Sequence, residues 1–500
     1  MDGSFLTKSQ TLDLRRKYVG PSCTLFFKSD PMKIVRAAGQ YMYDEEGHTY
    51  LDCINNVCHV GHCHPTVVEA ASAQMKKLNT NSRFLHDNLV ILAQKLISTM
   101  PPSLCMIYFT NSGSESNDLA LRLARHHTKA TEIISLDRAY HGHVTSLIDI
   151  STYKLNNMTD GVHKKPDFVH IAECPDTYRG KFRDVDHKHE DLGKLYASDV
   201  DDIISKVHSN NKKICCFIAE SMQSCGGQVI YPQGYLSKVF KSVKAAGGVN
   251  IADEVQTGYG RVGNHMWAFE NQDVVPDIVT IGKPMGNGHP VAAVITTKEI
   301  AASFGACGVE YFNTYGGNPV SCAVALAVLE VLKEEQLMEN ACRVGDAMRS
   351  KLTGLKEKYP RIIGDVRGVG MFWGIDMVKD EITREPATDD AAFVLKRLKD
   401  QFVLMSRDGP FENILKFKPP MCFNLENVDT VIELLDKVFN ELATIRESTS
   451  AREIRSTSFD ESLEVLEPPS KQIRLNGLDT SASDLEVTSV TPQLVSQKVC

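Results

Sequence analysis

Apolar and polar residues along this chain form blocks that predict strands and helices in alternation. Between residues 100 and 300, short apolar runs of strand length are separated by helical or turn-forming segments. β-Branched and aromatic residues dominate these runs, as is typical of buried strands. The predicted strands begin in the segments 106–125, 132–143, 213–221, 249–255 and 277–281. Strands that alternate with helices in this way favour an α/β fold with a parallel sheet.

Outside this central region the pattern is mainly helical. Residues 65–100 have a helical pattern that the polar stretch 79–83 interrupts. Within the central region, residues 156–194 read as a long polar loop. The remaining predictions are an amphipathic helix near 11–18, a hairpin that turns at 44–47, helix over 321–357, a glycine-containing strand over 366–378 and a final helix over 428–444.

The composition is that of a globular protein large enough for two or three domains. Hydrophobic residues make up 42% of the 500, and the formal net charge of -8 argues against nucleic acid as the main partner. No window holds 18 uninterrupted apolar residues, so we expect no membrane span. The 14 cysteines are scattered without a CxxC pair, which fits a reducing compartment. The N-terminus lacks the apolar segment of a secretory signal, and it resembles a mitochondrial presequence only weakly.

One loop, residues 276–290, has the strongest chemical signal. Its sequence, PDIVTIGKPMGNGHP, places Lys283 at the end of a short buried strand and before a run of glycine, asparagine and proline residues. Open α/β sheets bind ligands at such strand ends. A partly buried lysine loses its proton easily and can form a Schiff base. The alternative is an ordinary solvated lysine. We interpret Lys283 as a candidate pyridoxal-phosphate lysine.

Other strand ends carry residues that suit the same cofactor. Asn111-Ser112-Gly113-Ser114 joins a strand to a helix, and free N–H groups at a helix N-terminus bind phosphate, although an ordinary serine cap would look the same. Tyr140, Glu220 and Asp253 also stand at predicted strand ends, with Gln256 just beyond. A pyridoxal ring needs a lysine, an acid at its ring nitrogen, a phosphate cradle and a stacking face. We therefore expect these residues to converge at one edge of the sheet.

The segment HVGHCHP, residues 59–65, raises the question of a metal site. It holds three histidines and one cysteine, but their spacing matches no standard zinc pattern, and its glycine and proline indicate a turn. We predict no metal.

Across residues 20–440 the chain resembles the class III aminotransferases of pyridoxal-phosphate fold type I. The resemblance rests on NSGSESND, AYHG, IADEVQTGYGR, IGKPMGNGHP and NTYGGNPVSCA. It implies a large domain with a mostly parallel sheet flanked by helices, and a smaller α+β domain. It also implies that Lys283 carries pyridoxal 5'-phosphate and Asp253 pairs with the ring nitrogen. By the same resemblance, Gln256 lies near the phenolic oxygen, and Tyr140 stacks on the ring. Gly113 and Ser114 bind the phosphate, and Thr314 reaches the phosphate of the neighbouring subunit's cofactor.

Within this family the chain is most similar to the phospho-lyase subgroup, through phrases such as CINNV, ESMQSCGGQ and LKFKPPMCF. Family members usually have an arginine before the proline pair near the C-terminal end, where it binds the substrate carboxylate. This chain has Lys416 and Lys418 instead, and lysine suits phosphate but cannot form a planar two-point clamp. The predicted substrate ligands are Glu220, Arg83, Lys416 and Lys418.

The resemblance implies a lyase that eliminates phosphate from phosphoethanolamine and yields acetaldehyde, ammonia and inorganic phosphate. Two alternatives stay open: elimination from 5-phosphohydroxy-L-lysine, and amino transfer from amines or β-amino acids. A protein that binds the cofactor without catalysis is a third, weaker one.

The resemblance further implies a homodimer or homotetramer with shared active sites, located in mitochondria or alternatively in the cytoplasm. The expected divisions are 1–60, an N-terminal segment that completes the small domain; 61–325, the large cofactor domain; 326–445, the small domain; and 446–500, a disordered tail whose Ser, Thr, Glu and Pro content is typical of disorder.

Overall fold

The structure is a computed structural model that describes residues 6–80, 83–156, 158 and 164–460. The described part of residues 1–445 forms one compact unit, and the helical residues 446–460 belong to a second unit. The predicted tail beyond residue 460 lies outside the described residues.

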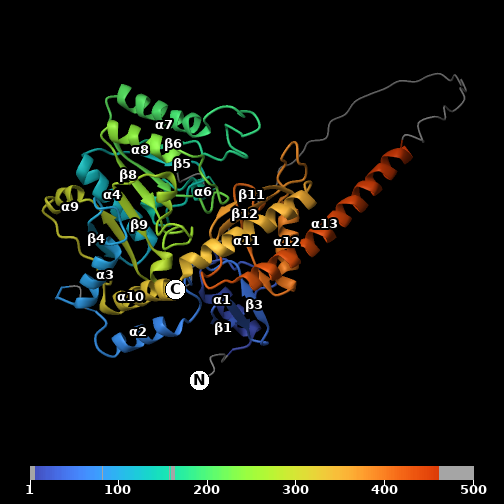
Figure 1. Ribbon diagram of the computed structural model, residues 1–500, viewed down its shortest axis with the longest axis horizontal. Helices are drawn as coiled ribbons and strands as arrows, with labels where there is room; N and C mark the ends of the chain where they lie inside the picture. Colours follow the sequence, from blue (N-terminus) through green and yellow to red (C-terminus); the bar gives the residue numbers. More distant parts are fainter. Residues whose placement is uncertain (1–5, 81–82, 157, 159–163, 461–500) are drawn as a thin grey trace, which may run out of the picture. The chain divides into compact units, whose positions relative to one another are not determined.

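A central sheet of seven described strands organises the first unit (Figure 1). All its pairings are parallel except those of β10, which is antiparallel to both neighbours. The predicted mostly parallel α/β sheet is therefore confirmed. In spatial order the strands are β4 (Met106–Thr110), β10 (Ala292–Thr296), β9 (Ile278–Ile281), β8 (Val249–Asp253), β7 (Ile214–Glu220), β5 (Glu132–Leu136) and β6 (Val169–Ala172).

Both faces of this sheet are buried, so its strands are apolar at successive positions rather than at alternate ones. In β7, Phe217 belongs to the core that includes α8 (Tyr235–Ala245), whereas Ile218 belongs to the core that includes α4 (Gly113–Thr128). The side chains of a strand alternate between its two faces. The continuous apolar runs in the sequence are thus explained by helices on both sides.

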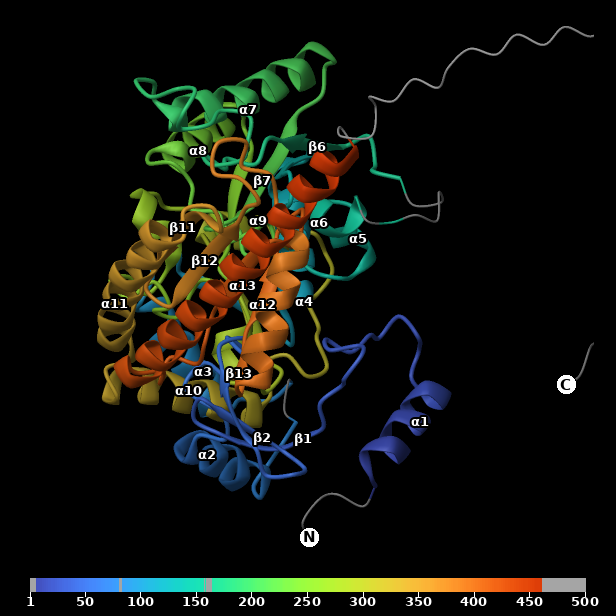
Figure 2. The ribbon, with the colours of Figure 1, turned by 90° about the vertical axis from the view of Figure 1, so that its right-hand side faces the viewer.

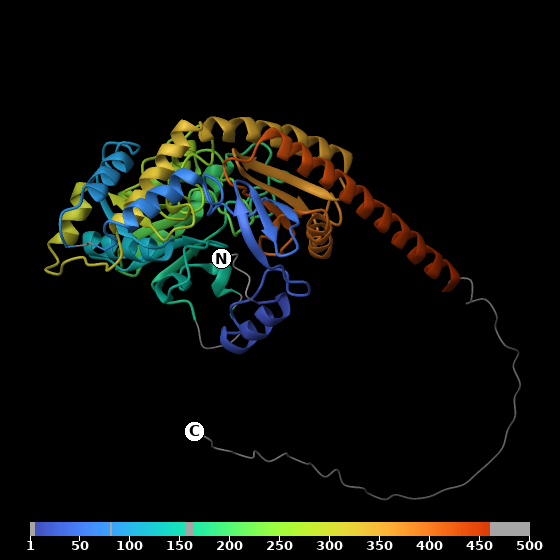
Figure 3. The same cartoon turned by 90° about the horizontal axis from the view of Figure 1, so that it is seen from below.

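Two smaller sheets complete the unit. β1 (Ile34–Ala38), β2 (Tyr41–Asp44) and β3 (Thr49–Asp52) form an antiparallel meander, which confirms the predicted hairpin, and β13 (Val403–Leu404) pairs in parallel with β3. Figure 3 shows these N-terminal strands beside the strands of the third sheet. That sheet has the order β11 (Ile363–Val369), β12 (Phe372–Met377), β15 (Ile414–Phe417) and β14 (Ser406–Asp408).

The glycine-containing strand predicted over 366–378 is observed as two strands, because the chain reverses at Gly370 and forms the β11–β12 hairpin. Gly370 has φ +55°, and a Cβ there would lie 2.3 Å from the carbonyl oxygen of Arg261. Only glycine fits such a turn without strain.

The helices lie over the sheets and along the edges. Figure 2 shows α11 (Leu337–Lys358) and α12 (Thr388–Asp400) beside the β11–β12 hairpin. The predicted boundary after residue 325 falls inside α10 (Pro319–Glu334), and the division into a large and a small domain stays a prediction. The other helices are α1 (Lys8–Tyr18), α2 (Pro65–Met75), α3 (Asp87–Ile97), α5 (Thr145–Ile148), α6 (Thr152–Leu155), α7 (Leu192–Ser209), α9 (Lys298–Gly305) and α13 (Leu425–Asp460), with short 3-10 turns η1 (Ala268–Gln272) and η2 (Lys283–Gly286).

Two further predictions need correction. The loop predicted over 156–194 contains β6, whose four residues are too few for a periodic signal. The helix predicted to end at residue 444 continues to Asp460, so residues 446–460 are helical rather than disordered. No glycine or proline interrupts the sequence before Pro468, and local sequence therefore allows the helix to continue. None of the described helices has the length and apolar character needed to span a bilayer.

Candidate active site

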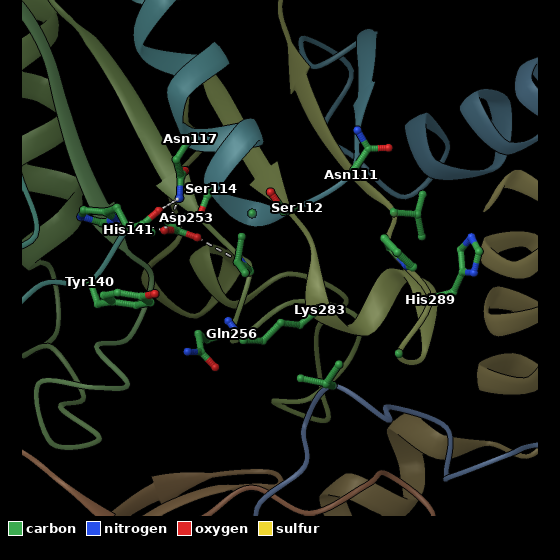
Figure 4. A pocket seen from close by; sticks show the side chains of 17 residues that line it. Asn111, Ser112, Ser114, Asn117, Tyr140, His141, Asp253, Gln256, Lys283 and His289 are labelled. Carbon is green, nitrogen blue, oxygen red and sulfur yellow. Dashed lines mark hydrogen bonds and ion pairs between the residues drawn. The ribbon is translucent and has the colours of Figure 1, made fainter. Parts of the chain in front are cut away.

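A cavity of about 310 Å³ opens at the carboxyl edge of the central sheet (Figure 4). The loops that follow several strands meet there because the carboxyl ends of parallel strands share one edge. The cavity is lined by all but one of the cofactor residues predicted from the sequence: Gly113, Ser114, Tyr140, Asp253, Gln256 and Lys283. Residues that are distant in the sequence are therefore brought together as expected.

Lys283 follows β9 and begins the turn η2, where the sequence predicted irregular loop. Asn287, in the left-handed conformation with φ +47°, fastens this turn to a neighbouring segment. Its amide oxygen accepts from the N–H of Val60 at 2.9 Å, and its amide nitrogen donates to the carbonyl of Gly61 at 2.8 Å. The Lys283 side chain extends toward Gln256 (Figure 4), and its amine has no hydrogen bond or ion pair with the described residues. That amine is available for chemistry.

Asp253, at the end of β8, is buried and held in position by two side chains. Its Oδ2 accepts from Nδ2 of Asn117 at 2.8 Å and from Nδ1 of His141 at 2.9 Å. Its Oδ1 accepts from the N–H of Val255 at 3.1 Å. Oγ1 of Thr280 also lies 3.5 Å from Oδ1, a long contact, because the Thr280 hydroxyl donates to Oδ1 of Asn117 at 2.7 Å. Asp253 lines the cavity, so its carboxylate can reach a group bound there.

The N-terminus of α4 faces the same cavity. Ser112 is its N-cap, with Oγ accepting from the N–H of Glu115 at 3.2 Å, and Gly113 and Ser114 are its first residues. A Cβ at Gly113 would come within 2.8 Å of the Val255 side chain, so glycine permits close packing against the loop after β8. The free N–H groups and the helix dipole make this a suitable phosphate site.

Tyr140 lines the cavity, and burial raises the pKa of its hydroxyl. Glu220 lies directly behind it and does not line the cavity. Its carboxylate accepts from the N–H groups of Tyr140 at 3.2 Å and Ser224 at 3.0 Å. Burial, only partly offset by His141 and reinforced by Asp253, raises the pKa of Glu220 to about 7. Glu220 thus supports the loop that carries Tyr140, and its predicted contact with substrate stays untested.

The two lysines before Pro419 have different surroundings. Lys418 is buried and donates to Oε1 of Gln256 at 2.9 Å. Lys416 forms an ion pair with Asp408, and the hydroxyl of Tyr153 donates to the same carboxylate at 2.6 Å. Asp408 outweighs the effect of burial and raises the pKa of Lys416. A substrate phosphate would therefore have to compete with Asp408 for Lys416.

Arg83 and Thr314 lie outside this cavity. Both are exposed, and the guanidinium of Arg83 stacks on the ring of Phe312 at 4.6 Å. The predicted role of Thr314 concerns the neighbouring subunit's cofactor, and a position away from its own chain's cavity agrees with that role without testing it.

The histidines of the segment 59–65 have protein partners rather than a shared metal geometry. His59 contacts the carbonyl of Tyr259, while His62 and His64 pair with Asp52 and Glu335. No cluster of three or more His, Cys, Asp or Glu side chains suited to a metal ion occurs in the described part of the chain.

Sequence reasoning missed several residues of the site. Asn117 and His141 hold Asp253, and Asn56 donates to Gln256 at 2.9 Å. Two of these carried a local signal: Asn117 lies one helical turn after Gly113, and His141 follows Tyr140 directly. Asn56 carried none, because its contact with Gln256 joins distant parts of the chain.

The residues at this cavity fit pyridoxal phosphate. Asp253 presents a carboxylate to the cavity for a protonated ring nitrogen, Lys283 has a free amine for the aldehyde, and α4 has free N–H groups for the phosphate. Tyr140 supplies an aromatic face at one side of the cavity.

Comparison with known proteins agrees with this geometry. The family model for class-III aminotransferases matches residues 27–439. A Drosophila melanogaster protein named alanine–glyoxylate aminotransferase 2-like is 55% identical over 85% of each chain. A Caenorhabditis elegans protein named ethanolamine-phosphate phospho-lyase homolog 1 is 47% identical over 86% of this chain and 93% of its own. Among solved structures, an Arthrobacter phospholyase in complex with phosphoethanolamine has a TM-score of 0.81 and 37% identity, covering 86% of this chain and 99% of that one.

Proposed function

This chain belongs to the class-III aminotransferase family, and from that premise we propose that it is a lyase that eliminates phosphate from phosphoethanolamine. Its cofactor is pyridoxal phosphate. The observation that carries the proposal is that no arginine of the described chain lines the cofactor cavity. An aminotransferase must hold the carboxylate of a keto acid, and arginine does this with a planar pair of hydrogen bonds. The phospho-lyase names of two similar proteins support the same choice.

The site residues divide the work of such an elimination. Bound in the cavity, the cofactor supplies a sink for the electrons of the carbon next to the substrate nitrogen. Asp253 would hold a proton at the ring nitrogen, and Asn117 and His141 keep its carboxylate in place. Lys283 Nζ, freed by the substrate amine, can remove the proton from that carbon. When the next carbon bears a phosphate ester, loss of phosphate competes with return of the proton.

The substrate's own phosphate needs a cation separate from the α4 site. We propose Lys416, which does not line the cofactor cavity but lines a second cavity together with Asp408 and Tyr153. Tyr153 in turn contacts Tyr140, with ring centroids 6.1 Å apart. Glu220, Arg83 and Lys418 stay predictions as substrate ligands, with the geometry favouring other roles for them. A mitochondrial location also stays a prediction from family resemblance.

The direct test is to offer phosphoethanolamine alone to the holoenzyme. We expect inorganic phosphate and acetaldehyde to appear in equal amounts without added keto acid, and Lys283→Ala protein to release neither. Phosphohydroxylysine is the parallel substrate for the alternative lyase. The name of the Drosophila relative favours amino transfer as the second candidate. Transfer from alanine to glyoxylate, with no phosphate release from either phospho-amine, would refute the lyase proposal.

We also propose that the enzyme is a dimer whose sites are shared. Large exposed apolar side chains gather beside the cavity, and such patches mark contact surfaces. Arg83 stacks on Phe312, which joins segments 83–85 and 309–315, and Asn111 at the cavity donates to Asn313 at 2.9 Å. The exposed apolar side chains are Phe84, Leu85, Val309, Phe312 and Tyr315.

If Thr314 binds the partner's cofactor, mixing two inactive or weakened variants should restore activity. A heterodimer of Lys283→Ala and Thr314→Ala chains contains one site with both native groups. We expect Thr314→Ala alone to weaken cofactor binding roughly 10- to 150-fold, as loss of a charge-assisted hydrogen bond does. The measurement is phosphate release after subunit exchange, with sedimentation to establish the dimer. A fully active monomer would contradict the proposal.

A further inference from the structure

The Gln256 carboxamide has only one orientation compatible with its neighbours. Its Oε1 accepts two hydrogen bonds, one from Nζ of Lys418 at 2.9 Å and one from Nδ2 of Asn56 at 2.9 Å. A flipped amide would place its own NH₂ group against these two donors, which would be repulsive. The orientation is therefore fixed from behind, and Nε2 is the group that Gln256 presents to the cofactor cavity.

Lys418 is a buried hydrogen-bond donor rather than a charged residue at the surface. It is only 3% exposed and follows β15, and its backbone N–H donates to the carbonyl of Cys53 at 2.9 Å. Its amine donates to Oγ of Ser224 at 2.6 Å as well as to Gln256, and it has no ion pair with the described acids. Burial and the charge of Lys416 lower the pKa of Lys418 well below its ordinary value.

We propose that Lys418 is a positioning residue for the cofactor: with Asn56, it turns the Gln256 amide so that Nε2 donates to the ring oxygen of bound pyridoxal phosphate. The inference rests on the cofactor and not on whether the reaction is elimination or amino transfer. Lys418 does not touch the cofactor and acts only through Gln256. Lys416 lies two residues earlier, within β15, and cannot replace Lys418 because its ammonium group is paired with Asp408.

The test is a pH titration of the visible absorption of holoenzyme without substrate, so it does not depend on turnover. A donor to the ring oxygen favours the deprotonated form of the cofactor bound to Lys283, and loss of that donor should raise the titration midpoint. From the net worth of one hydrogen bond, we expect a rise of roughly one pH unit for Gln256→Leu and about half a unit for Lys418→Met. Lys399→Met, which removes another buried lysine, one that pairs with Asp30 rather than with Gln256, should leave the midpoint unchanged.

The double variant Lys418→Met/Gln256→Leu decides the mechanism. If Lys418 acts only through Gln256, Lys418→Met should not change the titration midpoint further in protein that already carries Gln256→Leu. An unchanged midpoint in Lys418→Met, or an equal additional shift in the Gln256→Leu background, would overturn the inference. Asn56→Leu provides an independent variant should Lys418→Met fail to fold. It removes the other donor to Oε1, and the inference requires it to raise the midpoint as well.

Discussion

Replacement of Lys283 by alanine is expected to abolish both turnover and the covalent attachment of the cofactor. The Lys283 amine has no partner among the described residues and projects into the cavity at the end of β9. Without it, the cofactor aldehyde loses its covalent anchor and the substrate carbon loses its base. Loss of a positioned base alone lowers rates roughly 10²- to 10⁴-fold, and loss of the anchor adds to this.

Borohydride reduction followed by peptide mass analysis checks this prediction independently of activity. Wild-type protein should carry the reduced cofactor on Lys283, and Lys283→Ala protein should carry none. Lys298→Ala, which removes an exposed lysine at the start of α9, is the matched control and should behave as wild type. Attachment to a different lysine in the Lys283→Ala protein would show that the assignment is wrong.

Substitution of Asp253 by asparagine is expected to have the second largest effect. The asparagine side chain has nearly the same shape, but it carries no charge to hold a proton at the ring nitrogen. The electron-accepting capacity of the cofactor falls accordingly, and we expect kcat to decrease by roughly 10²-fold or more, as for other buried electrostatic groups at reacting centres.

The fold should survive this substitution, because the asparagine carbonyl can still accept from Asn117 or His141. Steady-state kinetics and thermal unfolding should therefore separate, with kcat strongly reduced and Tm little changed. Asp277→Asn is the control. Asp277 lies just before β9, at the opposite edge of the sheet from the cavity, and its carboxylate accepts from the N–H of Asn250 at 2.9 Å. Wild-type kcat in Asp253→Asn would remove Asp253 from the cofactor's electronic role.

Local sequence was enough to predict the elements whose residues line the cavity. The β-branched run 278–281, the glycine-rich turn after it and the Ser112 cap each carry a signal within a few residues. Parallel strands then bring their carboxyl ends to one edge, so Asp253, Tyr140 and Lys283 had to converge there once the sheet was predicted. The predictions failed where the signal was short or permissive, as at β6 and at the end of α13.

Only the tertiary structure decided what each buried polar group contacts. Periodicity shows which face of a strand is buried, but a hydrogen bond depends on which distant side chain arrives at that face. Lys416 and Lys418 look equivalent in the sequence, yet one meets Asp408 and the other meets Gln256. Likewise, Glu220 and Asp253 both end strands, but Glu220 accepts from backbone N–H groups behind Tyr140 while Asp253 faces the cavity. The packing between the sheets therefore determines what each of these charged residues contacts. A buried charge is costly unless it is paired, so the partner that packing brings close determines its role.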